Sequence, residues 1–375
     1  MIIANLLLKL TALVPMILLA LSLHFGAGMA FAALFYMTIF AFLADEALYA
    51  NGEVGRRQGR IDAFLAEAVP LVLGLGHLAL LPLAVIFIAQ GGQSLPDTLV
   101  TFMAFMLFFG TVSTANAHEM IHRRDRLRHH IGKWVFISIL FGHHTSAHML
   151  VHHRYAATPR DPNSARVNEG VYRFFLRAWS GSFRCGLNAE TARLAVNGRP
   201  ALHPANPYFI YVVGALVWLA GIYLAAGLRG VAIYLGFTTL AQMQLLLSDY
   251  VQHYGLQRRR LANGKYEPVS IHHSWNAPHA FTAALMLNAP KHSDHHAHPS
   301  VRYMHLRTRA SEGAPVLPRS LPVMSCIALV PGLWKRLMNP LVDDWRRRHA
   351  ADQIGFQPTE SQANVLSSPK AVFSG

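Results

Sequence analysis

The stretch His292-Ser293-Asp294-His295-His296-Ala297-His298-Pro299 is rich in histidine. On a helix, residues three and four apart share a face, so His292, His295 and His296 form an i, i+3, i+4 set. Three more groups occur earlier in the chain: His118-Glu119-Met120-Ile121-His122, His148-Met149-Leu150-Val151-His152-His153, and His253 within Asp249-Tyr250-Val251-Gln252-His253-Tyr254-Gly255. We expect these four groups to meet in space.

The composition is that of a membrane protein. Of the 375 residues, 53% are hydrophobic and 14% are charged, whereas a soluble domain carries about a quarter charged residues. Several windows reach the roughly 20 apolar residues that cross a bilayer, which argues against a soluble protein with buried helices. The sequence therefore predicts an all-α integral membrane protein.

The net charge of +14 is compatible with nucleic-acid binding. However, the arginine clusters lie beside apolar spans, where membrane proteins collect positive charge on the cytoplasmic side, so we expect no nucleic-acid partner. Cys185 and Cys326 are far apart and form no CxxC pair. They argue against a disulfide framework, an iron–sulfur cluster or a fused rubredoxin-like domain.

About six membrane spans are predicted. They cover residues 6–24, 29–46, 64–90, 95–117, 207–227 and 230–250. The first is a span rather than a signal peptide because Lys9 is its only charged flank and another span follows at once. The shorter apolar piece from Ile131 to Phe141 predicts an interfacial or re-entrant helix. We expect one domain over residues 1–350 and a loose tail over 351–375.

The charges of the loops predict the orientation. Loops after the second, fourth and sixth spans carry arginine triplets or more, whereas the loops after the first, third and fifth carry almost none. Because positive loops stay in the cytoplasm, both termini and all histidine groups are expected on the cytoplasmic side of a bacterial inner membrane.

The spacing within the histidine groups indicates shared metal ions. His118 and His122 are four residues apart and should project together from the end of a span. His148 and His152 should do the same, with His153 turned in a neighbouring direction. The grouped histidines are too many for one four-coordinate zinc, so we expect a pair of metals that share them. Imidazole suits iron, zinc, copper and nickel, and the membrane setting favours iron and oxygen chemistry.

Carboxylates should accompany these neutral ligands, because a ligating histidine usually passes its other N–H to an acceptor. Glu119, Asp249, Asp294 and Asp161 are the candidates, and each can equally be a solvated or helix-capping acid. For the first three, a catalytic role beside the ligands is expected. The remaining histidines are expected to support the ligands or the fold. They include His129, His130, His143, His144, His272, His273, His279 and His298.

Two other classes of metal-binding protein are compatible with parts of this pattern. The sequence His118-Glu119-Met120-Ile121-His122 matches HExxH, in which two histidines bind zinc and the glutamate is a general base. An intramembrane zinc protease would leave the other clustered histidines unexplained. A metal transporter would place its ligands near the middle of its spans, whereas these lie at span ends and beyond.

Over residues 30–310 the chain resembles the alkane 1-monooxygenase family of integral-membrane non-haem di-iron hydroxylases, within the wider membrane desaturase and hydroxylase superfamily. The resemblance rests on the HExxHR, Asp249–Leu256 and HSDHHAHP stretches. It also rests on His152-His153-Arg154 leading to Ala157-Thr158-Pro159-Arg160-Asp161-Pro162-Asn163-Ser164-Ala165-Arg166, and on His273-Ser274-Trp275-Asn276.

The resemblance implies a six-helix membrane domain with two irons above a hydrophobic channel. It implies nine iron ligands, which are His118, His122, His148, His152, His153, His253, His292, His295 and His296. The expected reaction is hydroxylation of the terminal methyl of an n-alkane with O2. Two electrons would come from a soluble rubredoxin or ferredoxin with its reductase. The basic residues Arg56, Arg57, Arg123, Arg124 and Arg258–Arg260 are candidates to dock such a partner.

Some positions depart from the family pattern. The second histidine group usually begins with a glutamate and has a small residue before its final pair, where this chain has Ala147 and Val151. The fourth group usually reads Glu-His-Tyr-Gly, and here Gln252 replaces the glutamate. These changes keep all nine ligands but leave the substrate open. A xylene-type methyl hydroxylase or a fatty-acyl desaturase or hydroxylase is the alternative.

Overall fold

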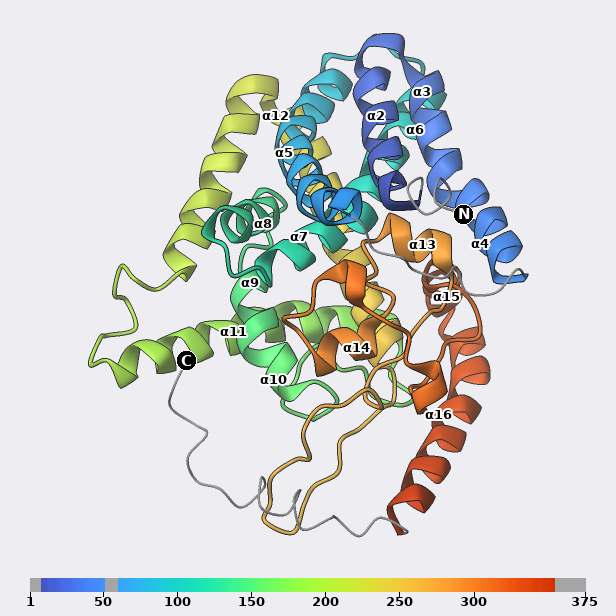
Figure 1. Cartoon of the computed structure of the whole chain (residues 1–375). Helices are drawn as coiled ribbons and strands as arrows, with labels where there is room; N and C mark the ends of the chain where they lie inside the picture. The colour runs from blue at the N-terminus through green and yellow to red at the C-terminus, as the bar shows by residue number, and fades with distance from the viewer. Residues whose placement is uncertain (1–7, 51–59, 355–375) are drawn as a thin grey trace.

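Long apolar helices form a bundle in the upper part of Figure 1, and shorter helices and loops gather below it. The computed structural model describes residues 8–50 and 60–354. Over these residues the regular structure is helical, with two isolated β-bridges. The all-α fold predicted from composition is therefore confirmed. Arg56 and Arg57 of the expected basic loop lie outside the described residues.

The bundle supplies the segments that can cross a membrane. It contains α2 (Leu13–Phe25), α3 (Ala27–Phe35), η1 (Tyr36–Phe40), α4 (Ala41–Ala50), α5 (Arg60–Gln90), α6 (Leu95–Leu107), η2 (Phe108–Ser113), α7 (Thr114–Ile121) and α12 (Tyr208–His253). Within the described part of the chain, four segments are long and apolar enough to span: Ala27–Leu48, Ala63–Gln90, Leu95–Ile121 and Tyr208–His253. The shorter α2 covers part of the expected span 6–24, which begins outside the described residues.

Helix α12 bends sharply at Gly227. Its 46 residues would extend about 69 Å if straight, more than twice the roughly 30 Å of a bilayer core. Gly227 has φ 62° and ψ −162°, a backbone region that is essentially restricted to glycine. Tyr211 bonds to Ser146 below the bundle, whereas Arg229 lies beside Gly91 at the opposite end. The two arms of α12 therefore run in opposite directions and correspond to the expected spans 207–227 and 230–250.

The lower layer carries most of the histidines. It contains α8 (Arg126–Ser138), α9 (His144–Ala147), η3 (His148–His152), α10 (His153–Tyr155), α11 (Val171–Val196), α13 (Ala280–Leu285), α14 (His292–Ala297), η4 (Tyr303–His305), η5 (Ala310–Glu312), α15 (Leu321–Ala328) and α16 (Pro331–Ile354). The short helix expected from Ile131 to Phe141 begins earlier, at Arg126, because the Asp125 carboxylate caps it by accepting from the Arg128 amide at 3.0 Å. Helix α16 continues past residue 350, where the tail was expected to begin.

Aromatic packing fills the bundle on the membrane side of the histidine layer. Phe105 and Phe109, from α6 and η2, surround Phe237 of α12 with ring centroids 6.3 and 5.5 Å apart. All three side chains are fully buried. Since lipid tails are as apolar as these side chains, close packing rather than water exclusion is what holds the helices together here. The packing fixes the ends of the spans, and with them the histidines that follow.

Candidate metal centre

Four segments bring the nine candidate ligands together. His118 and His122 lie at the end of α7, His253 ends the second arm of α12, and the remaining six lie on η3, α10 and α14. They form two groups whose ligand atoms lie within 4.8 Å of one another. The five-histidine group consists of His118, His122, His148, His153 and His295, and the four-histidine group consists of His152, His253, His292 and His296.

The five-histidine group converges on one point. The Nε2 atom of His148 lies 2.8 Å from that of His118, 3.1 Å from that of His122 and 2.9 Å from that of His153. One imidazole nitrogen cannot make three hydrogen bonds, because it carries either one proton or one lone pair. Imidazoles bound at about 2.1 Å to one metal, at right angles, have nitrogens about 3.0 Å apart. The spacing is therefore that of metal ligands.

The four-histidine group has the same geometry and is more deeply enclosed. His292 Nε2 lies 2.9 Å from His253 Nε2 and 3.0 Å from His296 Nε2. All four residues are buried, and His152 Nε2 has no hydrogen-bond partner. The two groups adjoin, since the rings of His153 and His296 lie 4.6 Å apart. The residues thus fit two neighbouring metal ions with only nitrogen donors.

The second histidine group is divided differently from the sequence expectation. His148 and His152 were expected to project together, but His148 joins His153 in one group while His152 joins the other. The physical reason is that residues 148–152 form a π-helical turn, in which the hydrogen bond runs from residue i to i+5. The wider turn places His148 and His153 on one side. His292 and His296 also stay together, whereas His295 points into the five-histidine group.

The imidazoles are kept neutral, as metal ligation requires. Burial, reinforced by repulsion between neighbouring imidazoles, lowers the pKa well below the ordinary value for six of the ligand candidates outside the spans. These are His122, His148, His153, His292, His295 and His296. A neutral ring has one nitrogen lone pair, so these residues can bind a metal without first losing a proton.

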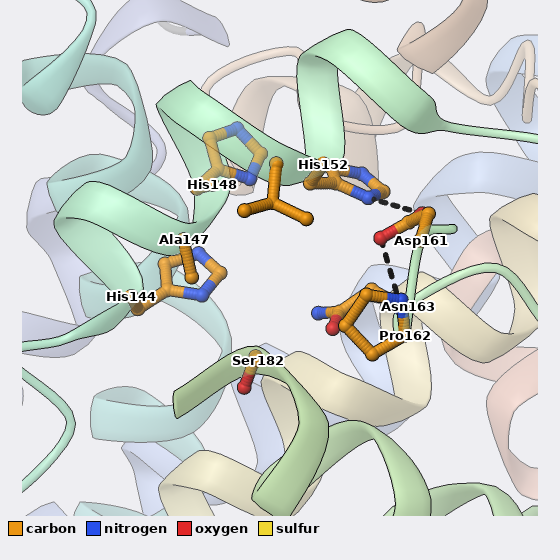
Figure 2. A pocket seen from close by; sticks show the side chains of 9 residues that line it. His144, Ala147, His148, His152, Asp161, Pro162, Asn163 and Ser182 are labelled. Carbon is orange, nitrogen blue, oxygen red and sulfur yellow. Dashed lines mark hydrogen bonds and ion pairs between the residues drawn. The ribbon is translucent and has the colours of Figure 1, made fainter. Parts of the chain in front are cut away.

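One carboxylate contacts a ligand candidate directly. Asp161 Oδ2 lies 2.8 Å from His152 Nδ1 and also accepts from the Ser164 hydroxyl at 2.7 Å. Figure 2 shows Asp161 between His152 and Asn163. Burial alone would lower the pKa of His152, but the Asp161 carboxylate raises it overall. This contact directs His152 Nε2 toward its own group.

The contact between Asp161 and His152 borders a small pocket behind the ligands. The pocket is lined by His144, Ala147, His148, Val151, His152, Asp161, Pro162, Asn163 and Ser182. Ala147 and Val151, the two departures in the second histidine group, are both among these residues (Figure 2 labels Ala147). Asn163 extends the polar contacts by donating to Asp249 Oδ2 at 2.7 Å. Asn163 and Ser164 had no role assigned from sequence, although both lie in the stretch that carries the family resemblance.

The three carboxylates predicted as catalytic lie in different settings. Asp249 is buried and contacts Asn163 rather than a ligand. Glu119 turns toward Arg123, whose Nε lies 3.5 Å from its Oε1. Asp294 accepts from Arg309 Nε at 3.1 Å and from the Arg307 amide at 2.8 Å, so it secures the loop after α14. A catalytic role for these three residues remains a prediction.

A third group, which the sequence did not suggest, consists of Glu267, His273 and His349. The Ser270 amide donates to His273 Nδ1 at 3.0 Å, and His273 Nε2 lies 3.2 Å from Glu267 Oε1. Because Nδ1 accepts from the Ser270 amide, a ring proton on Nε2 is the arrangement that lets His273 donate to Glu267. Nε2 then has no lone pair for a metal. We interpret the group of Glu267, His273 and His349 as a hydrogen-bonded support for the loop.

Gln252, which replaces the usual glutamate of the fourth group, has a structural contact. Its Nε2 donates to the Ala289 carbonyl at 3.1 Å, in the segment that precedes α14. The backbone carbonyl of Gln252 accepts from the Trp275 amide at 2.8 Å. The residue therefore ties the end of α12 to the segment that carries His292, His295 and His296.

The histidine centre at the ends of membrane helices agrees with comparisons to known proteins. A family model described as fatty acid desaturase matches residues 94–328. Alkane 1-monooxygenase 2 of Pseudomonas aeruginosa is 34% identical over 68% of this chain and 65% of its own length. Alkane 1-monooxygenase 1 of the same organism is 31% identical over 80% of each chain. The hydroxylase component of the xylene/toluene monooxygenase of Pseudomonas putida is 29% identical over 68% of this chain and 66% of its own length.

Fold and site together define a multi-pass membrane oxidoreductase of the desaturase superfamily, with histidine groups able to bind metal. Within that class, the chain belongs to the alkane 1-monooxygenase family. The family resemblance found in the histidine motifs is thus confirmed. The HExxH zinc-protease alternative is not supported, because His118 and His122 share their group with three further histidines.

Proposed function

We propose that this protein hydroxylates the terminal methyl group of a medium- or long-chain n-alkane to give a 1-alkanol. One oxygen atom of O2 enters the C–H bond, and the other leaves as water with two protons and two electrons. A rubredoxin or ferredoxin with its reductase supplies the electrons. The observation that carries the proposal is the convergence of nine buried or half-buried imidazoles in two adjoining groups at the ends of apolar helices.

The chain's own residues have three tasks in this proposal. The nine imidazoles hold two iron ions, which supply the oxidising chemistry when bound. Asp161 and Ser164 orient His152, so that its ligating nitrogen faces the centre. The apolar residues of the bundle exclude water and position the methyl group on the membrane side of the histidines. His118, His122, His148, His152, His153, His253, His292, His295 and His296 are the proposed ligands.

The proposal includes the placement of the protein in the membrane. About six spans, with the two arms of α12 counted separately, put the histidine layer and both termini on the cytoplasmic face of a bacterial inner membrane. Supporting this orientation, the loops at the histidine end carry Arg123, Arg124, Arg126 and Arg258–Arg260. Residues 1–350 form the proposed membrane domain, and 351–375, which begin with the last turn of α16, form its tail.

The test uses whole cells that make the protein together with a rubredoxin or ferredoxin and its reductase. The cells receive octane, hexadecane and p-xylene, and products are measured by gas chromatography. We expect 1-alkanols that disappear in His295→Ala but persist in His24→Ala, a histidine outside both groups. A benzylic alcohol alone would favour the xylene-type reaction, to which the similarity with the Pseudomonas putida protein also points. No product despite bound iron and an active partner would favour a fatty-acyl substrate.

A further inference from the structure

Helix α11 presents a narrow apolar stripe that no part of the described chain covers. Tyr172, Leu176, Trp179 and Phe183 are all exposed, with Leu176 76% and Trp179 54% accessible. At 3.6 residues per turn these four side chains lie within about 60° of one another around the helix axis. Arg173 and Arg184 are exposed beside the stripe. An apolar stripe with aromatic residues and flanking arginines is typical of helices that lie in a membrane interface.

Other side chains of α11 pack against the elements around the candidate ligands. Ser146, next to α9's last residue, donates to the Glu190 carboxylate at 2.6 Å. Gly186 allows a close approach, because a Cβ there would lie 3.1 Å from Ala147. Arg177 donates to the Pro162 carbonyl at 2.7 Å, beside Asp161. The stripe is therefore the outer face of a helix that is firmly attached to the histidine layer.

Two contacts place the stripe at the depth of a bilayer surface. Phe183 packs edge-on against Tyr208 with ring centroids 5.2 Å apart. Tyr208 begins the first arm of α12, about 30 Å along the helix from the bend at Gly227, which is the thickness of a hydrocarbon core. Trp179 Nε1 donates to Gln242 at 2.7 Å, and Gln242 lies about 16 Å along the second arm from His253. Both arms thus carry the stripe at the histidine-side edge of the membrane.

The apolar edge continues beyond α11. The Tyr172 hydroxyl donates to the Leu329 carbonyl at 2.8 Å. Leu329, Val330 and Leu333, around the start of α16, are 41%, 55% and 51% exposed. At one end the stripe continues into the membrane-facing surface of α12, and at the other end into these residues. The one occupant that fits such a stripe is a lipid leaflet.

We propose that α11 is an interfacial helix, whose Tyr172, Leu176, Trp179 and Phe183 insert into the leaflet on the histidine side while Arg173 and Arg184 contact lipid headgroups. The leaflet then supports the helix on which α9 and η3 rest. This proposal depends on the membrane fold and not on the proposed substrate, so it can fail or hold independently of the hydroxylation test.

The test measures the surroundings of single labels on α11. Cys185 and Cys326 are first replaced by serine. Leu176→Cys and the matched Asn188→Cys, which is exposed on the polar side of the same helix, are then labelled with an environment-sensitive fluorophore. The proteins are reconstituted in vesicles of phosphatidylethanolamine and phosphatidylglycerol. Quenching by lipids with a nitroxide near the headgroup is compared with quenching by aqueous iodide.

We expect the label at 176 to be quenched several-fold more by the nitroxide lipid than the label at 188, and iodide to show the reverse order. Equal access of iodide to both positions would overturn the proposal. Shielding of position 176 from both quenchers would also overturn it, because a second copy or a protein partner would then cover the stripe. If Leu176→Cys does not fold, Leu333→Cys provides the same comparison on the continuation of the edge.

Discussion

Hydrogen bonding differs between individual ligand candidates. Asp161 accepts from His152, whereas the Nδ1 atoms of His148, His153, His292 and His296 are buried without a partner. A carboxylate that accepts from a ligand fixes the ring orientation and raises the basicity of the ligating nitrogen. Among the described acids, Asp161 is therefore the residue whose charge should matter most to metal binding.

Replacing Asp161 with asparagine should weaken metal binding by about tenfold, the lower end of the effects seen when such a partner is changed. The side chain keeps its shape but loses the charge that faces His152. Iron content after dialysis against graded chelator, measured by mass spectrometry, checks this. Asp294→Asn is the control, because Asp294 contacts Arg309 and His298 rather than a ligand. Equal iron retention in Asp161→Asn and wild type would contradict the prediction.

Glu267 should make the metal-free protein sensitive to acid. Burial alone would raise its pKa, but hydrogen bonds from His273 and the Arg259 amide lower it to about 2. A folded-state pKa below the unfolded value stabilises the protein above the ordinary pKa of about 4.5, and this stabilisation is lost as pH falls toward 2. The Glu267→Gln variant should therefore have a lower Tm than wild type at neutral pH. Its Tm should also fall less than that of wild type when the pH is lowered.

The measurement is the Tm of chelator-treated protein near neutral pH and at about pH 3, which lies inside the predicted window. Glu46→Gln is the control, since Glu46 is half-buried and its ion pair with Arg319 is longer, at 3.6 Å. A Glu267→Gln variant with the same decrease in Tm as wild type would show that Glu267 is not the source of the acid sensitivity.

At the scale of elements, non-standard turns position the site. The π-helical turn η3 sends His148 and His152 to different groups. A second π-helical turn, η2, precedes the helix that ends with His118 and His122. The bend at Gly227 returns α12 to the histidine layer, where it ends at His253. Each of these irregular elements precedes or contains ligand candidates, so their geometry controls which side chains converge.

Gly227→Ala should destabilise the protein by roughly 1–3 kcal/mol, because alanine pays a steric cost at this φ and ψ. The matched control is Gly221→Ala in the first arm of the same helix. Gly221 has open space around its Cβ position and no positive φ, so this change should be neutral or stabilise by up to about 1 kcal/mol. Thermal unfolding in nanodiscs checks both variants. A Gly227→Ala protein as stable as Gly221→Ala would refute the role of the bend.

At the scale of the whole molecule, the candidate centre joins distant parts of the chain. His122 of α7 lies against His153 of α10 and His295 of α14, and His152 of η3 lies against His253 of α12. Without bound ions, these neutral rings face one another without hydrogen-bond partners for several of their nitrogens. Metal binding should therefore stabilise the assembly of all four segments at once.

Removing the metal should lower the Tm, and restoring Fe(II) should recover it. A ligand at a thousand times its Kd stabilises the folded state by about 4 kcal/mol. Scanning fluorimetry of chelator-treated and reconstituted protein measures the change, and His24→Ala should behave like wild type. His295→Ala and His296→Ala should each show a smaller recovery. An unchanged Tm after complete loss of iron would mean that the histidine groups fold without the metal.

The sequence alone determined the all-helical membrane class, and it predicted the spans and the candidate ligands, because apolar length and histidine spacing are local properties. It also predicted that His118 and His122 project together, and the structure places both in one group, since they lie on and directly after a regular helix. Only the tertiary structure decided that the nine histidines divide into five and four, that Asp161 rather than Glu119 or Asp294 contacts a ligand, and that α11 exposes an apolar stripe. These features depend on how four distant segments pack and on a π-helical turn, and a period of 3.6 residues predicts neither.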